Sequence, residues 1–377
     1  MKKLSAILLA GLVLVGGLAA AAAGGSATDP LVSRSYLTNT FIPSVVKQAS
    51  DRIDTATGTT YDNALARLKA QADLYLARAG GGAGYAESFA EQRFKRGDVI
   101  TVNTGSELML LAGSAAVSYE SGAVVDVTAG TVKPSGTAMV EQRRYVAAEG
   151  TSCRATVTSD TAVLAPRGYY TLTPSGETDY NQLAGALKAM GLFKGTGTAY
   201  GEGFDLEKPP TRIEGLVLFL RLVGEERAAL SYVGENPFVD VPDWAKQYVS
   251  YAYGKGYTKG VDEELKLFGT NIIITSGEYL TFVMRALGYQ DSGDLPDFSW
   301  DTALDKARDF GLITAGERQR LDPAQPFLRA QVAYVSYHAL SAERKAGGSL
   351  QSYLISNGTL TLQQVNEANA RVTTKRV

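Results

Sequence analysis

A plan of helix, turn and helix occurs three times in the C-terminal half of the chain, and it constrains the fold of that half. Gly191, Gly256 and Gly311 stand at matching turns, where a glycine can adopt the left-handed conformation that ends a helix. One helix pair cannot bury both of its apolar stripes alone, so we expect the copies to pack into one module. The copies include residues 186–224, 251–288 and 306–341.

The second helix of each copy has a recognisable start. Thr211 and Thr275 suit N-caps, and Glu214 and Glu278 follow three residues later, which is the spacing of a capping box. We therefore interpret both glutamates as helix caps rather than as acid/base groups. Leu328 occupies the corresponding position of the third copy.

The composition excludes several functional classes. The chain has 377 residues, with 37 Lys and Arg against 39 Asp and Glu, and this balance argues against a nucleic-acid partner. With one histidine, His338, and one cysteine, Cys153, it lacks the residues for a His-based triad, a Cys–His dyad or a zinc site. A glycosidase built on carboxylates alone stays open, although no long barrel-like domain is available to hold it. We expect no enzyme activity and no cofactor.

The N-terminal part begins with a targeting pattern. Residues 1–23 combine two lysines, an apolar run and small residues, as a cleaved signal peptide does. No later stretch reaches the length of a transmembrane span. Residues 28–80 read as two helices: a first that starts at Asp29 and Pro30 and that Pro43 kinks or splits, and a second from Tyr61 to Ala79, followed by a linker at Gly80–Gly84. We interpret this segment as a helical spacer, with self-association as the alternative.

Residues 85–174 change to a period of two, with Val, Thr and Tyr enriched and glycines at regular intervals. This pattern predicts a small antiparallel β-barrel or sandwich that displays or binds something. Cys153 lies in one alternating run, where we expect a buried side chain rather than a reactive thiol. The expected strands are 99–102, 107–111, 115–119, 124–127, 137–144, 155–158, 162–165 and 169–172.

The predicted fold class is therefore α+β and multidomain: a helical N-terminal segment, an all-β domain and an all-α module of three repeats. In the module, the repeats are bounded at 179–226, 236–289 and 297–343, and a C-terminal tail follows at 344–377.

The second copy resembles an S-layer homology repeat. The resemblance rests on the run Phe238–Val241, on Trp244-Ala245, on Gly256–Gly260, and on an Arg-Ala-Leu-Gly ending at Gly288. The first copy carries Thr211-Arg212-Ile213-Glu214, which is similar to the Thr-Arg-Ala-Glu signature of that family. The resemblance covers about half of the chain, strongly in the second copy, well in the first and weakly in the third.

The resemblance implies a pseudo-threefold bundle that holds a secreted protein non-covalently to a secondary cell-wall polysaccharide, typically a pyruvylated one. The family binds this ligand in grooves between repeats, through the signature arginine, an aspartate, a tryptophan and nearby glycines. A guanidinium can donate two hydrogen bonds to a ketal-linked carboxylate, and an indole face suits the apolar side of a sugar. Carried over by position, the ligand-binding set is Arg212, Asp240, Trp244, Gly256, Gly260 and Arg329.

Departures from the signature limit the number of complete grooves. Ser276 replaces the arginine in the second copy, and Gln331 replaces the glutamate in the third. We expect full binding sets only in one or two grooves, those that use Arg212 or Arg329. Each arginine has a structural alternative as the partner of a neighbouring carboxylate. Trp244 and Trp300 we interpret mainly as packing at the edge of the core, a role compatible with sugar contact.

These observations predict an exported, non-catalytic protein of the cell wall or cell surface that is anchored to polysaccharide by its repeats. The alternative is a structural or self-associating extracellular protein whose repeats no longer bind a saccharide.

Overall fold

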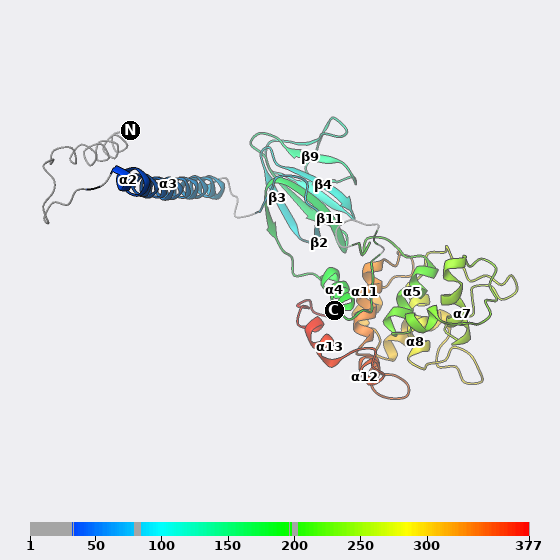
Figure 1. Ribbon diagram of the computed structural model, residues 1–377. Coiled ribbons are helices and arrows are strands. Elements are labelled where there is room, and N and C mark those ends of the chain that lie inside the picture. The colour runs from blue at the N-terminus through cyan, green and yellow to red at the C-terminus, as the bar shows by residue number, and fades with distance from the viewer. Residues whose placement is uncertain (1–31, 33, 79–83, 196, 198–202, 377) are drawn as a thin grey trace. The chain divides into compact units, whose positions relative to one another are not determined.

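The computed structural model describes residues 32, 34–78, 84–195, 197 and 203–376. The chain divides into two compact units, Met1–Arg78 and Ala79–Val377. The predicted signal peptide, linker residues 80–83 and most of the glycine-rich run before Phe204 lie outside the described residues. The predicted fold class is confirmed: a helical N-terminal segment, an antiparallel β-domain and a helical C-terminal region (Figure 1).

Within the first unit, residues 34–78 form one continuous helix, so the prediction of a separate second helix from Tyr61 is wrong, and Pro43 does not split the helix. It consists of α2 (Arg34–Tyr36), a π-helical turn η1 (Leu37–Phe41) and α3 (Ile42–Arg78). The Ile42 N–H donates to Leu37 O, five residues back, in this wider turn. The turn ends two residues before Pro43, and the altered bonding register accommodates a residue that has no N–H to donate. Side chains of the described residues up to Lys69 are exposed.

The β-domain is an antiparallel sheet that encloses an apolar core. Period-two alternation explains its strands, because alternate side chains of β3 and β10 point into that core. The strands are β1 (Gly84–Ala86), β2 (Gln92–Lys95), β3 (Val99–Asn103), β4 (Glu107–Ala112), β5 (Ala115–Ser118), β6 (Val124–Asp126), β7 (Thr131–Lys133), β8 (Thr137–Ala138), β9 (Arg144–Ala147), β10 (Ser152–Val157) and β11 (Thr161–Thr173).

Strand β11 joins the two parts of this sheet. Its first half pairs with β2 and β4, and its second half pairs with β1 and β3. The two separate strands predicted at 162–165 and 169–172 are therefore one strand. Gly168 lies between them with φ of +88°, and a side chain there would collide with Ser106. The glycine permits a close strand crossing, whereas the sequence pattern indicated a turn.

The helical module begins at Tyr180. Its helices are α4 (Tyr180–Ala189), α5 (Arg212–Leu222), α6 (Glu226–Leu230), α7 (Lys246–Gly254), α8 (Ser276–Ala286), α9 (Ala303–Asp309), α10 (Ala315–Arg320), α11 (Arg329–Ala339), α12 (Leu350–Ser356) and α13 (Leu362–Asn369). Two 3-10 turns, η2 (Asp243–Ala245) and η3 (Trp300–Thr302), precede α7 and α9.

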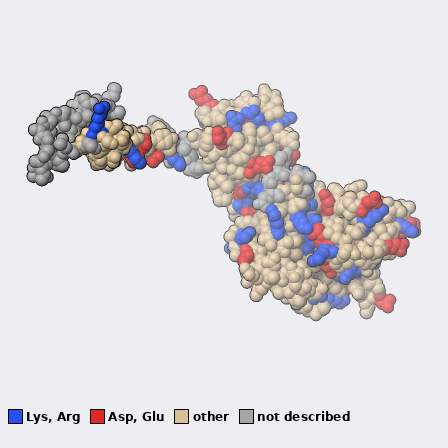
Figure 2. All heavy atoms as spheres, in the orientation of Figure 1, with Lys and Arg blue, Asp and Glu red and all other residues tan. Residues whose placement is uncertain are grey.

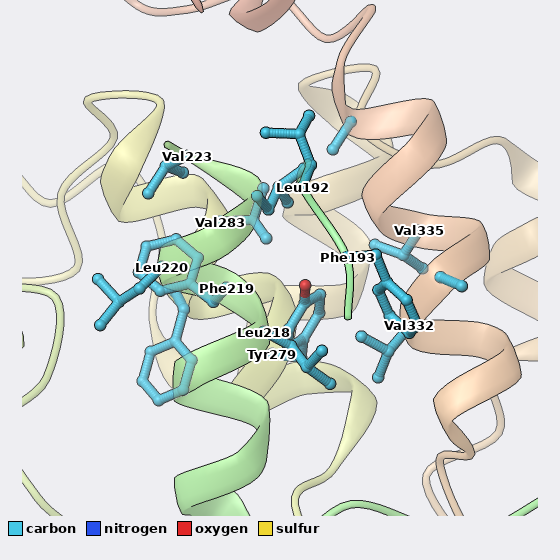
Figure 3. Close-up of a cluster of buried hydrophobic side chains, with 14 of the residues drawn as sticks. Leu192, Phe193, Leu218, Phe219, Leu220, Val223, Tyr279, Val283, Val332 and Val335 are labelled. Carbon is cyan, nitrogen blue, oxygen red and sulfur yellow. The ribbon is translucent and has the colours of Figure 1, made fainter. Parts of the chain in front are cut away.

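The second helices of the three repeats, α5, α8 and α11, share one core. Leu218 and Phe219 of α5, Tyr279 of α8 and Val332 of α11 converge on the segment after α4 (Figure 3). The Tyr279 hydroxyl, fully buried, lies 2.6 Å from Ser336 Oγ. Each helix contributes part of an apolar stripe that it cannot bury by itself, which is the reason for a threefold assembly.

The segment predicted as a C-terminal tail, 344–377, contains α12 and α13. Leu350, Leu354 and Val365 are buried in the core of the module. These apolar residues lie on α12 and α13, two helices that the sequence prediction does not include. The chain then returns to the first repeat, where Thr374 Oγ1 accepts the Asp179 N–H at 3.0 Å. The C-terminus therefore lies beside α4 (Figure 1).

Candidate functional site

The three matching glycines end the first helices in the same way. Gly191, Gly256 and Gly311 have φ of +76°, +73° and +73°. In each copy the following residue donates its N–H to a carbonyl five residues back; in the second, Tyr257 N–H donates to Ala252 O at 2.8 Å. Gly256, a predicted ligand residue, is thus a helix C-cap, and the space beside its Cα is open.

The predicted capping boxes are present at the second helices of the first two repeats. The Glu214 carboxylate accepts the Thr211 N–H at 2.8 Å, and the Glu278 carboxylate accepts the Thr275 N–H at the same distance. In the third repeat Gln331 Oε1 accepts the Leu328 N–H, also at 2.8 Å. An amide replaces the carboxylate there without loss of this bond.

Backbone hydrogen bonds dock the start of a second helix on the loop of the next repeat. Arg212 N–H donates to Ile272 O at 2.7 Å, which joins the first repeat to the second. Arg329 N–H donates to Lys208 O at 2.9 Å, which joins the third repeat to the first. Ile272 and Lys208 occupy equivalent loop positions, three residues before their capping threonines. Both signature arginines therefore mark the same kind of junction.

The Arg212 side chain lies between a carboxylate and two aromatic rings. One of its Nη atoms is 2.6 Å from Glu278 Oε1, and its guanidinium lies 5.3 Å and 5.2 Å from the ring centres of Phe268 and Phe282. The residue is only 5% exposed, and its Nε has no hydrogen-bond partner in the described part of the chain. Burial lowers the pKa of Arg212, while Glu278 acts in the opposite direction.

The Asp240 carboxylate holds the loop on which Arg212 rests. It accepts the backbone N–H groups of Phe268, Gly269 and Thr270 at 2.7, 2.8 and 3.0 Å. Burial alone would raise the pKa of Asp240, but these three donors outweigh it and hold the pKa below its ordinary value. Asp240 therefore fixes the backbone on which the arginine packs.

Gly260 packs against the same loop from another side. Its φ is +82°, and an added Cβ would lie 2.5 Å from both Leu267 O and the Phe238 ring. Arg212, Asp240 and Gly260, three residues of the predicted ligand-binding set, thus gather around residues 267–270. The contacts that bring them together are internal contacts of the fold.

Trp244 and Trp300 lie on the surface, so the prediction that they pack at the edge of the core is wrong. Trp244 is 60% exposed and Trp300 is 83% exposed. Each belongs to the 3-10 turn before a first helix, and an alanine one or three residues later, Ala245 or Ala303, is buried in its place. Two large aromatic faces are therefore open to solvent.

Arg329 is buried in a different environment from Arg212. Its Nε donates to Phe204 O at 2.8 Å, its Nη2 lies 3.4 Å from Lys194 O, and its guanidinium is 5.8 Å from the Phe193 ring centre. The residue is 4% exposed, and burial lowers its pKa. The structure therefore places Arg329 in backbone contacts, apart from the loop around Asp240.

Sequence reasoning missed the aromatic partners of Arg212. Phe268 precedes Thr275 by seven residues, the interval that separates Phe204 from Thr211. Both phenylalanines contact a signature arginine of another repeat: Phe268 contacts Arg212, and Phe204 contacts Arg329. The shared interval of seven residues was visible in the sequence.

The ends of the second helices differ among the repeats. Arg221 pairs with Glu226 at 2.8 Å, and Arg285 Nε donates to Asp291 at 3.1 Å. His338, at the matching position of α11, packs its ring against Tyr334 and Tyr337 instead. Burial first, and Arg376 second, lower the pKa of His338 to about 4, so it is neutral at pH 7.

Other chemistry in the described residues is limited. No three His, Cys, Asp or Glu side chains are grouped there so that they could hold a metal ion, and no helix there has both the length and the apolar character to cross a bilayer. Burial raises the pKa of Cys153 to about 11, which keeps the thiol protonated. On the face drawn in Figure 2, residues of both charge signs are interspersed.

Comparison with known proteins relates the chain to proteins of the cell wall and cell surface. No family model matches it. It is 32% identical over 134 residues to a middle cell wall protein of Brevibacillus brevis, 29% over 154 residues to a cell surface protein of Thermoanaerobacter kivui, and 32% over 125 residues to a surface layer protein of Brevibacillus choshinensis. These matches cover 35%, 39% and 32% of this chain, but only 12%, 19% and 11% of the relatives.

Proposed function

We propose that the protein is exported and held at the cell surface by its three helical repeats, which act as S-layer homology repeats and bind an acidic cell-wall polysaccharide. The relation to cell-wall, cell-surface and surface-layer proteins supports the location. The arrangement around Arg212 supports the binding site: a guanidinium on two aromatic rings, in a repeat junction, next to the repeat that carries the exposed Trp244.

The observation that carries the proposal is the unsatisfied Nε of Arg212. A buried donor without an acceptor costs about 1–3 kcal/mol, and Glu278 uses only one Nη atom of the guanidinium. The Nε–H points to the same side of the guanidinium as Nη2, so a ligand carboxylate bound there gains both donors of this fork, in the bidentate geometry that arginine prefers. In this proposal Glu278, bonded to Nη1, already neutralises part of the positive charge and so competes with the ligand carboxylate for the guanidinium.

The competing function is a structural one, and the same ion pair favours it. Arg212, Asp240 and Arg329 all make internal contacts, so the repeats could fold and assemble without a saccharide. The two functions predict different outcomes when Glu278 is substituted. If Glu278 competes with a ligand, removing its charge strengthens binding; if the pair is only structural, removing it leaves binding unchanged.

The test is sedimentation of the full chain with purified cell walls of the producing organism, with and without their attached polysaccharide. We expect retention only on walls that keep the polysaccharide. Glu278→Gln keeps a cap for the Thr275 N–H and should raise retention, whereas Arg212→Ala should lower it. No retention of the unaltered chain on intact walls would exclude anchoring.

An exposed residue separates binding from folding. Trp244→Ala removes a side chain that is 60% exposed, so the fold should persist while retention falls. Trp300→Ala is the matched control, because its indole is also exposed but the preceding repeat has Ser276 in place of the arginine. Equal effects of the two substitutions would argue against a site centred on Arg212.

A further inference from the structure

A cavity of about 500 Å³ lies where the β-domain meets the helical module, away from the loop around Asp240. Its volume is in the range of pockets that bind small molecules. Its lining includes Arg96 and Asp160 of the β-domain and Tyr180, Arg320, Gln325 and Tyr334 of the helical module.

The floor of the cavity is aromatic and apolar. Tyr180 of α4 and Tyr334 of α11 lie with their ring centres 5.7 Å apart, and Leu321, Leu328 and Val335 surround them. Burial raises the pKa of Tyr180 far above its ordinary value, so its hydroxyl stays protonated. This floor suits the apolar face of a ring, with a hydroxyl at its edge.

The charges around the cavity balance one another. Arg96 donates to Asp160 at 2.9 and 3.2 Å, and the buried Glu317 accepts Arg376 at 2.8 and 2.9 Å. Two charged lining groups remain, Arg320 and Glu177, and neither forms an ion pair within the described part of the chain. Because these two are of opposite sign, the cavity favours a ligand without net charge.

The rim offers both donors and acceptors. Arg320, the Tyr180 hydroxyl and the Gln331 amide nitrogen can donate, since Gln331 Oε1 is already bonded to Leu328 N–H. Glu177 and the Gln325 amide oxygen can accept. Planar polar groups of both kinds around an apolar floor match a ring that carries hydroxyl groups, each of which donates and accepts.

We propose that this cavity binds an uncharged saccharide of one or two rings. The site is separate from the acidic-polysaccharide site proposed around Arg212, and it takes its residues from two parts of the chain. Arg96 and Asp160 come from the β-domain, and Tyr180, Arg320 and Gln325 come from the helical module. A bound saccharide therefore contacts both.

The test is isothermal titration calorimetry of the full chain with glucose, N-acetylglucosamine and their β-1,4-linked disaccharides, and with glucuronate as a charged probe. We expect saturable one-to-one binding of at least one uncharged sugar, and weaker binding of glucuronate. Absence of binding by all four uncharged sugars, or preference for glucuronate, would overturn the proposal. The assay contains no cell wall, so its result is independent of the anchoring test.

Substitutions at the rim locate the site. Arg320→Ala and Gln325→Ala change exposed side chains and should each weaken binding about ten-fold, the loss expected for a hydrogen bond to a charged or polar group. Arg318→Ala is the matched control on the same helix, because Arg318 pairs with Asp305 and does not line the cavity. Unchanged affinity in both rim variants would place any binding elsewhere and contradict the proposal.

Discussion

The junction between the first and second repeats and the junction between the third and first begin with the same backbone contact but end differently. At both, an arginine N–H donates to a loop carbonyl of the next repeat. The Arg212 side chain then meets a carboxylate, whereas the Arg329 side chain meets two backbone carbonyls. The shared motif position therefore determines the backbone contact, and the residues of the neighbouring loop and helix determine which groups the guanidinium contacts.

The junction between the second and third repeats shows what remains without the arginine. Ser276 stands at the signature position, and within the described residues its N–H makes no backbone bond to Gln325, the equivalent loop residue. Tyr279 provides the contact instead, through Ser336 Oγ and the Phe327 ring. The three second helices therefore share one core, while their junctions differ in the residues that join them.

The largest effect is expected for Arg329→Ala. The substitution removes a buried cation and leaves Phe204 O without its donor, so the free energy of unfolding should fall by about 3 kcal/mol. Urea denaturation of the full chain, followed by far-UV circular dichroism, measures this change. A loss under 1 kcal/mol would show that the two carbonyls find other donors.

Arg212→Ala should cost less, about 2 kcal/mol, because Glu278 is partly exposed and water can replace the arginine. A double-mutant cycle with Glu278→Ala isolates the pair, with an expected coupling energy of about 1 kcal/mol. The cycle uses the same urea denaturation. A loss larger than that of Arg329→Ala would reverse the comparison between the two junctions.

Much of this architecture could be predicted from the sequence, for a physical reason. Glycine C-caps, capping boxes and period-two strands are local features, and Gly256, Thr275 and β3 adopt the conformations that their neighbours dictate. Side-chain partners are not local. Glu278 lies 66 residues from Arg212, and no pattern in the chain indicates that this cap also pairs with the arginine.

The same limit explains the errors. A glycine reads as a turn whether it ends a strand or permits a close crossing, so Gly168 divided one strand into two predicted ones. A tryptophan reads as a core residue by its size, yet Ala245 fills the core beside Trp244. Both outcomes depend on what packs against the residue, and the sequence alone does not contain that information.

Asp240→Asn tests whether the loop under Arg212 depends on a charged acceptor. The folded pKa of Asp240 is depressed, so its stabilisation is present above the ordinary value of 3.8 and is lost as the pH falls through the lower folded value. At pH 7 we expect a loss of about 1 kcal/mol in urea denaturation. Asp243→Asn, on an exposed side chain three residues away, should change little.

The effect that is smallest at pH 7 concerns the opposite ends of the same helices, where His338 stands in place of Arg221 and Arg285. Its folded pKa of about 4 is below the ordinary value of 6.5, so between these values the unfolded chain binds a proton that the folded chain does not. Stability should therefore decrease as the pH is lowered from about 6.5 to 4. His338→Phe keeps a ring against Tyr334 and Tyr337 and should flatten that part of the profile, measured by thermal unfolding. If stability falls equally steeply with pH in the unaltered chain and in His338→Phe, the pH dependence comes from the carboxylates and not from His338. In that case the histidine does not make the third repeat more sensitive to acid than the other two.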